Sequence, residues 1–118
     1  MQAAVHAYVR ALNDADLEAI ALLFADDAVV EDPVGSLPKR GIAEIRAFYA
    51  GSLSLKLQAE LEGPVRAVAD AAAFAFRVSF EIDGQRTVIR PIDVFRFNDA
   101  GRIVQMSAFF GPAHIGAD

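Results

Sequence analysis

The sequence predicts an α+β fold, in which helices from the first half of the chain cover one face of a curved antiparallel or mixed sheet. Up to about residue 52, apolar residues recur every three or four positions, which is typical of amphipathic helices. From about residue 55 they alternate with polar residues, as in half-buried strands. Helices followed by strands favour this layered arrangement. The length of 118 residues predicts a single domain, 1–118.

Three helices are expected. The first places Val5, Tyr8 and Leu12 on one face. The second runs over 17–27, where the helical spacing restarts after a group of cap-type residues. The third runs over 42–52.

The remaining elements are strands and turns. Asp83-Gly84 is a typical hairpin turn, and 70–72 is a second turn candidate. The segment 111–118 follows no recognisable pattern. We expect strands at 28–32, 55–61, 65–69, 74–82, 86–97 and 102–110.

Composition excludes several classes of function. The net charge is −5 and no Lys/Arg cluster occurs, so binding to nucleic acid or to an anionic membrane is not expected. The chain has no cysteine and two widely separated histidines, so we expect no metal and no thiolate chemistry. No apolar run is long enough to span a membrane and no secretory signal is evident, which predicts a cytoplasmic protein. The 54% hydrophobic content, with nine Phe, indicates a lined pocket or a subunit interface.

Asp93 shares its predicted strand face with apolar residues. Alternation along its strand places it on the same face as Phe95 and Phe97, while Arg90 and Arg96 point the other way. Burial without a cation raises the pKa of a carboxyl, and a neutral carboxylic acid can donate a hydrogen bond. The alternative is a structural hydrogen bond to backbone.

Asp32 and Tyr8 are further candidates. Asp32 ends a short apolar strand, and Pro33 restricts it to extended backbone angles. Its carboxylate could take a proton from carbon, or Asp32 could simply form a turn. Tyr8 is either a core aromatic bonded to backbone or a donor to a ligand.

Aromatic residues supply candidate pocket walls, although such stripes are more often plain core. Tyr49 is assigned a pocket-lining role only. The other candidates for contact with a substrate are Phe48, Phe76, Phe80, Phe95 and Phe110.

The chain resembles the bacterial 3-oxo-Δ5-steroid isomerases, or ketosteroid isomerases, over roughly residues 5 to 110. The matching stretches are specific mainly in combination, in order and with matching gaps. They include Tyr-Val-Arg-Ala-Leu-Asn at 8–13, Val-Glu-Asp-Pro-Val-Gly-Ser at 30–36, Ile-Arg-Ala-Phe-Tyr-Ala at 45–50, Ala-Phe-Ala-Phe at 73–76 and Pro-Ile-Asp-Val-Phe-Arg-Phe-Asn at 91–98.

The resemblance implies a site and a reaction. Asp32 matches the catalytic base, Tyr8 the oxyanion-hole phenol and Asp93 the protonated oxyanion-hole carboxyl; this family is itself the reference example of a carboxyl kept neutral in an apolar site. The implied reaction moves the double bond of an apolar 3-oxo-Δ5 steroid into conjugation by proton transfer from carbon 4 to carbon 6, without a cofactor. The implied fold is an open cone covered by three helices, as in nuclear transport factor two-like proteins. Members are usually homodimers.

Other functions remain open on this fold, because one fold hosts many chemistries. Polyketide cyclisation, dehydration and epoxide hydrolysis are enzymatic alternatives. A non-catalytic binder of an apolar ligand would need the pocket but no free base at Asp32.

Overall fold

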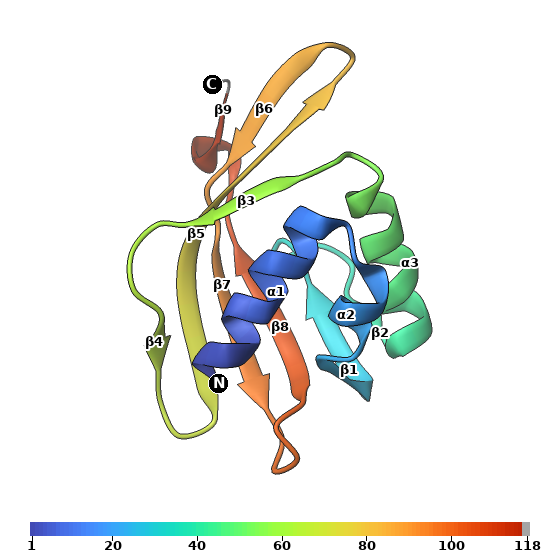
Figure 1. Ribbon diagram of the computed structural model, residues 1–118, viewed down its shortest axis with the longest axis vertical. Helices are drawn as coiled ribbons and strands as arrows, with labels where there is room; N and C mark the ends of the chain where they lie inside the picture. The colour runs from blue at the N-terminus through green and yellow to red at the C-terminus, as the bar shows by residue number, and fades with distance from the viewer. Residues whose placement is uncertain (117–118) are drawn as a thin grey trace.

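Three helices and one nine-stranded mixed sheet make up the fold in the computed structural model, which describes residues 1–116 (Figure 1). The helices lie together on one side of the sheet, and the hairpin formed by β5 and β6 projects beyond them. Within residues 1–116, no helix is long and apolar enough to cross a bilayer. The helices are α1 (Gln2–Asp14), α2 (Leu17–Ala21) and α3 (Ile42–Leu53).

The sheet is open, with the order β2-β1-β8-β7-β5-β6-β9, while β3 and β4 also pair with β5. Strands β1 and β8 are parallel and the other pairs are antiparallel, so the predicted curved mixed sheet under three helices is confirmed. The strands are β1 (Phe24–Glu31), β2 (Lys39–Arg40), β3 (Gln58–Leu61), β4 (Arg66–Ala67), β5 (Ala71–Ile82), β6 (Gln85–Ile89), β7 (Ile92–Phe97), β8 (Ile103–Phe109) and β9 (Ile115–Gly116).

The long strand β5 joins two parts of the sheet. Its first half, 71–75, pairs with β7, and its second half, 78–82, pairs with β6. Asp83 and Gly84 connect β5 to β6 with φ angles of 52° and 78°, so the predicted hairpin turn is confirmed.

The prediction of one continuous strand over 86–97 is wrong. The chain breaks between β6 and β7 at Arg90 and Pro91, and each part pairs with a different half of β5. Pro91 has no N–H to give to a ladder, which explains an interruption at this point. The Pro91 carbonyl instead accepts from the N–H of Phe76, and Arg90 N–H donates to the carbonyl of His114.

Several other boundaries differ from the sequence prediction. The second helix ends at Ala21 instead of 27, because the chain from Phe24 pairs with β8 as strand β1. The predicted turn at 70–72 is mostly strand, since Ala71 and Ala72 already pair with β7. Long-range pairing outweighs the local pattern in both places.

Two further predicted strands are shorter than expected, and the tail, for which the sequence predicted no structure, forms a turn and a strand. The strand expected over 55–61 begins only at Gln58, because α3 first closes with a bond from Lys56 N–H to the carbonyl of Leu53. The strand expected over 65–69 reduces to β4. The tail forms a short 3₁₀ turn, 112–114, and then β9 against β6; residues 117–118 lie outside the described part.

The core lies between the helices and the inner face of the sheet. Helix α1 buries Val5, Tyr8 and Leu12, as its spacing predicts. It ends at Ala15 in a left-handed conformation (φ 53°), and the Asp16 carboxylate then accepts from the N–H of Ala19 to cap α2. In the rest of the core, sheet residues pack with Ile45 and Tyr49 of α3. These sheet residues are Phe24, Phe74, Phe95, Ile103 and Met106.

Candidate active site

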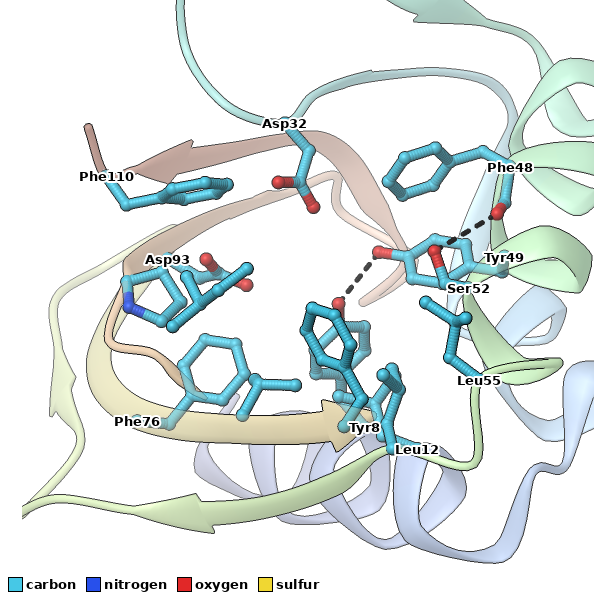
Figure 2. A pocket seen from close by; sticks show the side chains of 15 residues that line it. Tyr8, Leu12, Asp32, Phe48, Tyr49, Ser52, Leu55, Phe76, Asp93 and Phe110 are labelled. Atoms are coloured by element: carbon cyan, nitrogen blue, oxygen red, sulfur yellow. Dashed lines mark hydrogen bonds between the residues drawn. The ribbon is translucent and has the colours of Figure 1, made fainter. Parts of the chain in front are cut away.

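A pocket opens between α1, α3 and the inner face of the sheet (Figure 2). Its volume is about 270 Å³, just below the range of roughly 300–1,000 Å³ common for ligand pockets, so it suits one compact ligand. Most of its wall is aliphatic or aromatic. The polar groups that line it are Tyr8, Asp32, Tyr49, Ser52 and Asp93.

Asp93 is a central residue of the sheet. It pairs with Phe74 of β5 on one side and with Ala108 of β8 on the other. Its side chain is 1% exposed, and its buried Oδ1 has no hydrogen-bond partner among the described residues. Desolvation raises the pKa of Asp93 well above its usual value, and the negative charge of Asp32 raises it further. Both effects favour the neutral carboxylic acid, which, unlike a carboxylate, can donate a hydrogen bond.

Two phenols from different helices meet at the pocket wall. The hydroxyl oxygens of Tyr8 and Tyr49 are 2.9 Å apart, and both side chains are buried. Desolvation raises the pKa of both groups well above 10, so both are neutral. Each hydroxyl has one proton. If Tyr8 donates to a ligand, Tyr49 must be the donor in the bond between them.

The ring of Tyr8 is held edge-on by aromatic neighbours. Its centroid lies 5.1 Å from that of Phe95 at 85°, and 6.2 Å from that of Phe74 at 66°. Such T-shaped contacts favour one ring orientation. Phe95, which the sequence proposed as a pocket-lining residue, is not in the pocket wall. It is fully buried in the core, where it supports Tyr8.

Asp32 follows the last residue of β1. Ala28 and Val30 are buried on the inner face, and the alternation carries the Asp32 side chain to the same face. The Asp32–Pro33 peptide bond is cis, which the sequence did not predict. Desolvation raises the pKa of Asp32 from 3.8 to about 6, against the opposing effect of the Lys39 ammonium.

The three residues singled out from the sequence are brought together. Tyr8 comes from α1, Asp32 from the end of β1 and Asp93 from β7, and all three line one cavity. Figure 2 shows the two carboxyl groups pointing into this cavity from different sides.

The structure also places most of the predicted aromatic residues in the wall: Phe48, Tyr49, Phe76, Phe80 and Phe110. Sequence reasoning missed several wall residues. Their alternation or helical spacing marked them only as apolar or, for Ser52, as a helix end. They are Leu12, Ser52, Leu55, Leu57, Val78, Ile89 and Pro91.

This arrangement provides an acid and a base in one apolar site. A pKa of about 6 lets Asp32 ionise near neutral pH and accept a proton, while the stronger burial of Asp93 favours its neutral, hydrogen-bond-donating form. Tyr8 adds a second neutral donor. The chemistry available is proton abstraction with stabilisation of a developing oxyanion.

Comparison with known proteins identifies relatives. A family model described as the SnoaL-like domain matches residues 5–106. The chain is 45% identical over 112 residues to a curated steroid Δ-isomerase of Nocardioides simplex, covering 95% of this chain and 90% of that protein.

Solved structures with the same architecture agree with this match. The epoxide hydrolase/cyclase-like enzyme SalBIII, which takes part in pyran ring formation in the polyether salinomycin, superposes with a TM-score of 0.92 at 28% identity, over 99% of this chain and 95% of that one. A Mycobacterium tuberculosis protein in complex with estradiol-17β-hemisuccinate superposes with a TM-score of 0.89, over 98% of this chain and 96% of that one; at 24% identity, this likeness bears on the fold alone. The chain belongs to the SnoaL-like domain family and, within it, to the steroid Δ-isomerases.

Proposed function

We propose that this protein is a steroid Δ-isomerase that moves the double bond of a 3-oxo-Δ5-steroid to the conjugated Δ4 position. The proton leaves carbon 4 and is returned to carbon 6, with a dienolate between the two steps. The observation that carries this proposal is the buried Asp93 carboxyl, which lines the same apolar cavity as Asp32 and Tyr8 and whose Oδ1 has no hydrogen-bond partner within residues 1–116. The 45% identical steroid Δ-isomerase supports the reaction class.

Asp32 is the general base in this proposal. It takes the proton from carbon 4 and, still within the pocket, gives the same proton to carbon 6. A pKa of about 6 makes Asp32 a stronger base than an ordinary aspartate, yet leaves it ionised at neutral pH. The apolar wall keeps water from competing for the proton.

Tyr8 and Asp93 form the oxyanion hole. A proton next to a ketone is far less acidic than an Asp carboxyl, so the base alone cannot reach the dienolate. Donors aimed at the steroid 3-oxygen lower the energy of the charge that develops there. Each 1.4 kcal/mol or so gained in the transition state raises the rate about tenfold. Neutral donors suit this task because they carry no charge to repel the oxyanion.

Conversion of 5-androstene-3,17-dione tests the proposal. With micromolar pure protein, we expect ultraviolet absorbance to rise as the conjugated enone forms. The matched control is Asp99→Asn, which removes a carboxylate from an exposed turn outside the pocket and is expected to leave the rate unchanged. No rise in absorbance, with steroid binding retained, would favour a non-catalytic binding module.

Epoxide opening is the second candidate, favoured by the close superposition on SalBIII. That chemistry needs a proton donor at the epoxide oxygen, and Asp93 could supply one. A panel containing an epoxide substrate and the Δ5-steroid separates the two: turnover of the epoxide alone would overturn the isomerase assignment.

A homodimer is also proposed. Ile92 and Phe109 are paired across β7 and β8 and are about half exposed, at 49% and 51%. Paired apolar side chains at the surface are typical of subunit contacts. Sedimentation of the pure protein measures its mass in solution and so distinguishes a dimer from a monomer. A cytoplasmic location stays a prediction from the sequence.

A further inference from the structure

A lysine on a two-residue strand shares a face of the sheet with Asp32. Lys39 of β2 pairs directly with Val30 of β1, and paired residues of antiparallel strands project to the same side of a sheet. Val30 is buried on the inner face, and Asp32 lies two residues farther along β1 on that face. Lys39 and Asp32 are therefore diagonal neighbours on one face.

The ammonium group of Lys39 is held in place by two contacts. Its Nζ donates to the Leu37 carbonyl at 3.3 Å and lies 5.8 Å from the centroid of the Phe48 ring, within the range of a cation–π contact. Phe48 is part of the pocket wall, but Lys39 is not. The ammonium thus contacts a residue of the wall, while Lys39 itself does not line the pocket.

We infer that Lys39 is a positioning residue for the proposed base: its ammonium, fixed beside the pocket wall, holds Asp32 in the ionised form that accepts the proton. This inference rests on the proposed function. Lys39 lies outside the Val-Glu-Asp-Pro-Val-Gly-Ser stretch at 30–36 and is not among the residues that line the pocket. A desolvated carboxylate needs a nearby positive charge if it is to stay ionised in an apolar site.

Among residues 1–116, Lys39 is the positive group that lowers the pKa of Asp32, and the other titratable groups around Asp32 carry no positive charge. Tyr8 of α1 and Tyr49 of α3 are neutral phenols, and burial raises the pKa of Asp93 of β7, which favours its neutral form. Desolvation raises the pKa of Asp32, and Lys39 lowers it.

Charged residues on the neighbouring elements act elsewhere. Glu31 alternates to the opposite face of β1, and Arg40 pairs with Val29 on that same face. The carboxylate of Glu44, on α3, accepts from the backbone N–H of Arg40. Arg40 therefore provides a matched control, with the same charge and strand but the opposite face.

The test compares Lys39→Met with Lys39→Arg and Arg40→Met. Methionine keeps the length and apolar stem of lysine without its charge, so packing on Phe48 is retained. In Lys39→Met we expect the acid limb of kcat/KM to move to higher pH by roughly half a unit to one unit, less than the one to three units typical of a contact pair. Activity at pH 5 then falls about three- to tenfold, while activity at pH 9 is unchanged. Lys39→Arg and Arg40→Met are expected to keep the wild-type profile.

Direct titration of the Asp32 carboxyl by ¹³C NMR, in protein without ligand, separates the two proposals. A shift in Lys39→Met alone supports the role of Lys39 even if no steroid is converted, in which case only the proposed function fails. An unshifted Asp32, or an equal shift in Arg40→Met, overturns the inference. A loss of activity that is the same at every pH, with melting temperature lowered, would also overturn it, because it would mark a purely structural role.

Discussion

The two carboxyls of the pocket occupy contrasting surroundings. Asp93 lies inside the sheet between β5 and β8, is 1% exposed and has no cation among the causes that shift its pKa. Asp32 lies just beyond the end of β1, is partly exposed and has Lys39 on the same face. Both pKa values are raised by desolvation, but only that of Asp32 is opposed by a positive charge.

This difference teaches that position in the sheet, and not residue type, assigns the roles. The negative charge of Asp32 raises the pKa of Asp93, so ionisation of Asp32 makes it harder for Asp93 to lose its proton. Partial exposure and Lys39 favour the ionisation of Asp32. This difference is consistent with the proposed role of Asp93 as the neutral donor.

The largest expected effect is the loss of the base. Asp32→Asn keeps the shape of the side chain but cannot accept a proton, so we expect kcat to fall by about 10³-fold or more, within the roughly 10²–10⁴-fold typical of general base catalysis. Steroid affinity should be retained. Steady-state kinetics and equilibrium binding of a steroid-like phenol measure the two quantities. An active Asp32→Asn protein would show that Asp32 is not the general base, and the proposed difference in role between Asp32 and Asp93 would then fail.

The next effect concerns the neutral donors. Asp93→Ala and Tyr8→Phe each remove one donor, and a loss of about 10²–10³-fold in kcat is expected for each, as for other oxyanion-hole donors. Asp93→Asn keeps an N–H donor and should lose less than Asp93→Ala. If Asp93→Asn and Asp93→Ala were equally impaired, donation by Asp93 would not be what matters. Wild-type activity in both Tyr8→Phe and Asp93→Ala would contradict the oxyanion-hole assignment.

The smallest effect is on stability, and it depends on pH. The folded-state pKa of Asp32, about 6, lies above its unfolded value of 3.8, so the unfolded chain ionises first as pH rises and stability falls between about pH 4 and 6. A difference of about two units corresponds to up to about 3 kcal/mol. We therefore expect Asp32→Asn to raise the free energy of unfolding by up to about 3 kcal/mol at pH 8, with the gain disappearing below about pH 4.

Urea denaturation at several pH values checks this prediction. Asp99→Asn is again the control, since Asp99 is exposed. A gain that stays constant across the pH range would show that the charge of Asp32 is not its source.

The local sequence pattern alone was enough to predict the three helices and the buried face of the main strands. Periodicity placed Tyr8 on the buried face of α1 and Asp93 on the aromatic face of β7. It did so because burial of one face is the strongest constraint on a helix or strand. Boundaries were less well predicted: the helix expected to reach residue 27 gave way to β1, whose partner β8 lies some 80 residues away in the chain.

What the sequence by itself determined is the order of the three helices and the longer strands, their inner faces and the polar residues on those faces. Only the tertiary structure decided which of these residues meet. The bond between Tyr8 and Tyr49 joins positions 41 residues apart, and Phe95 supports the Tyr8 ring instead of lining the pocket. Lys39 shares a sheet face with Asp32 through a strand too short to recognise in the sequence. The reason is physical: periodicity records which side of an element is buried, whereas the contact between two elements depends on pairing and packing that no local pattern contains.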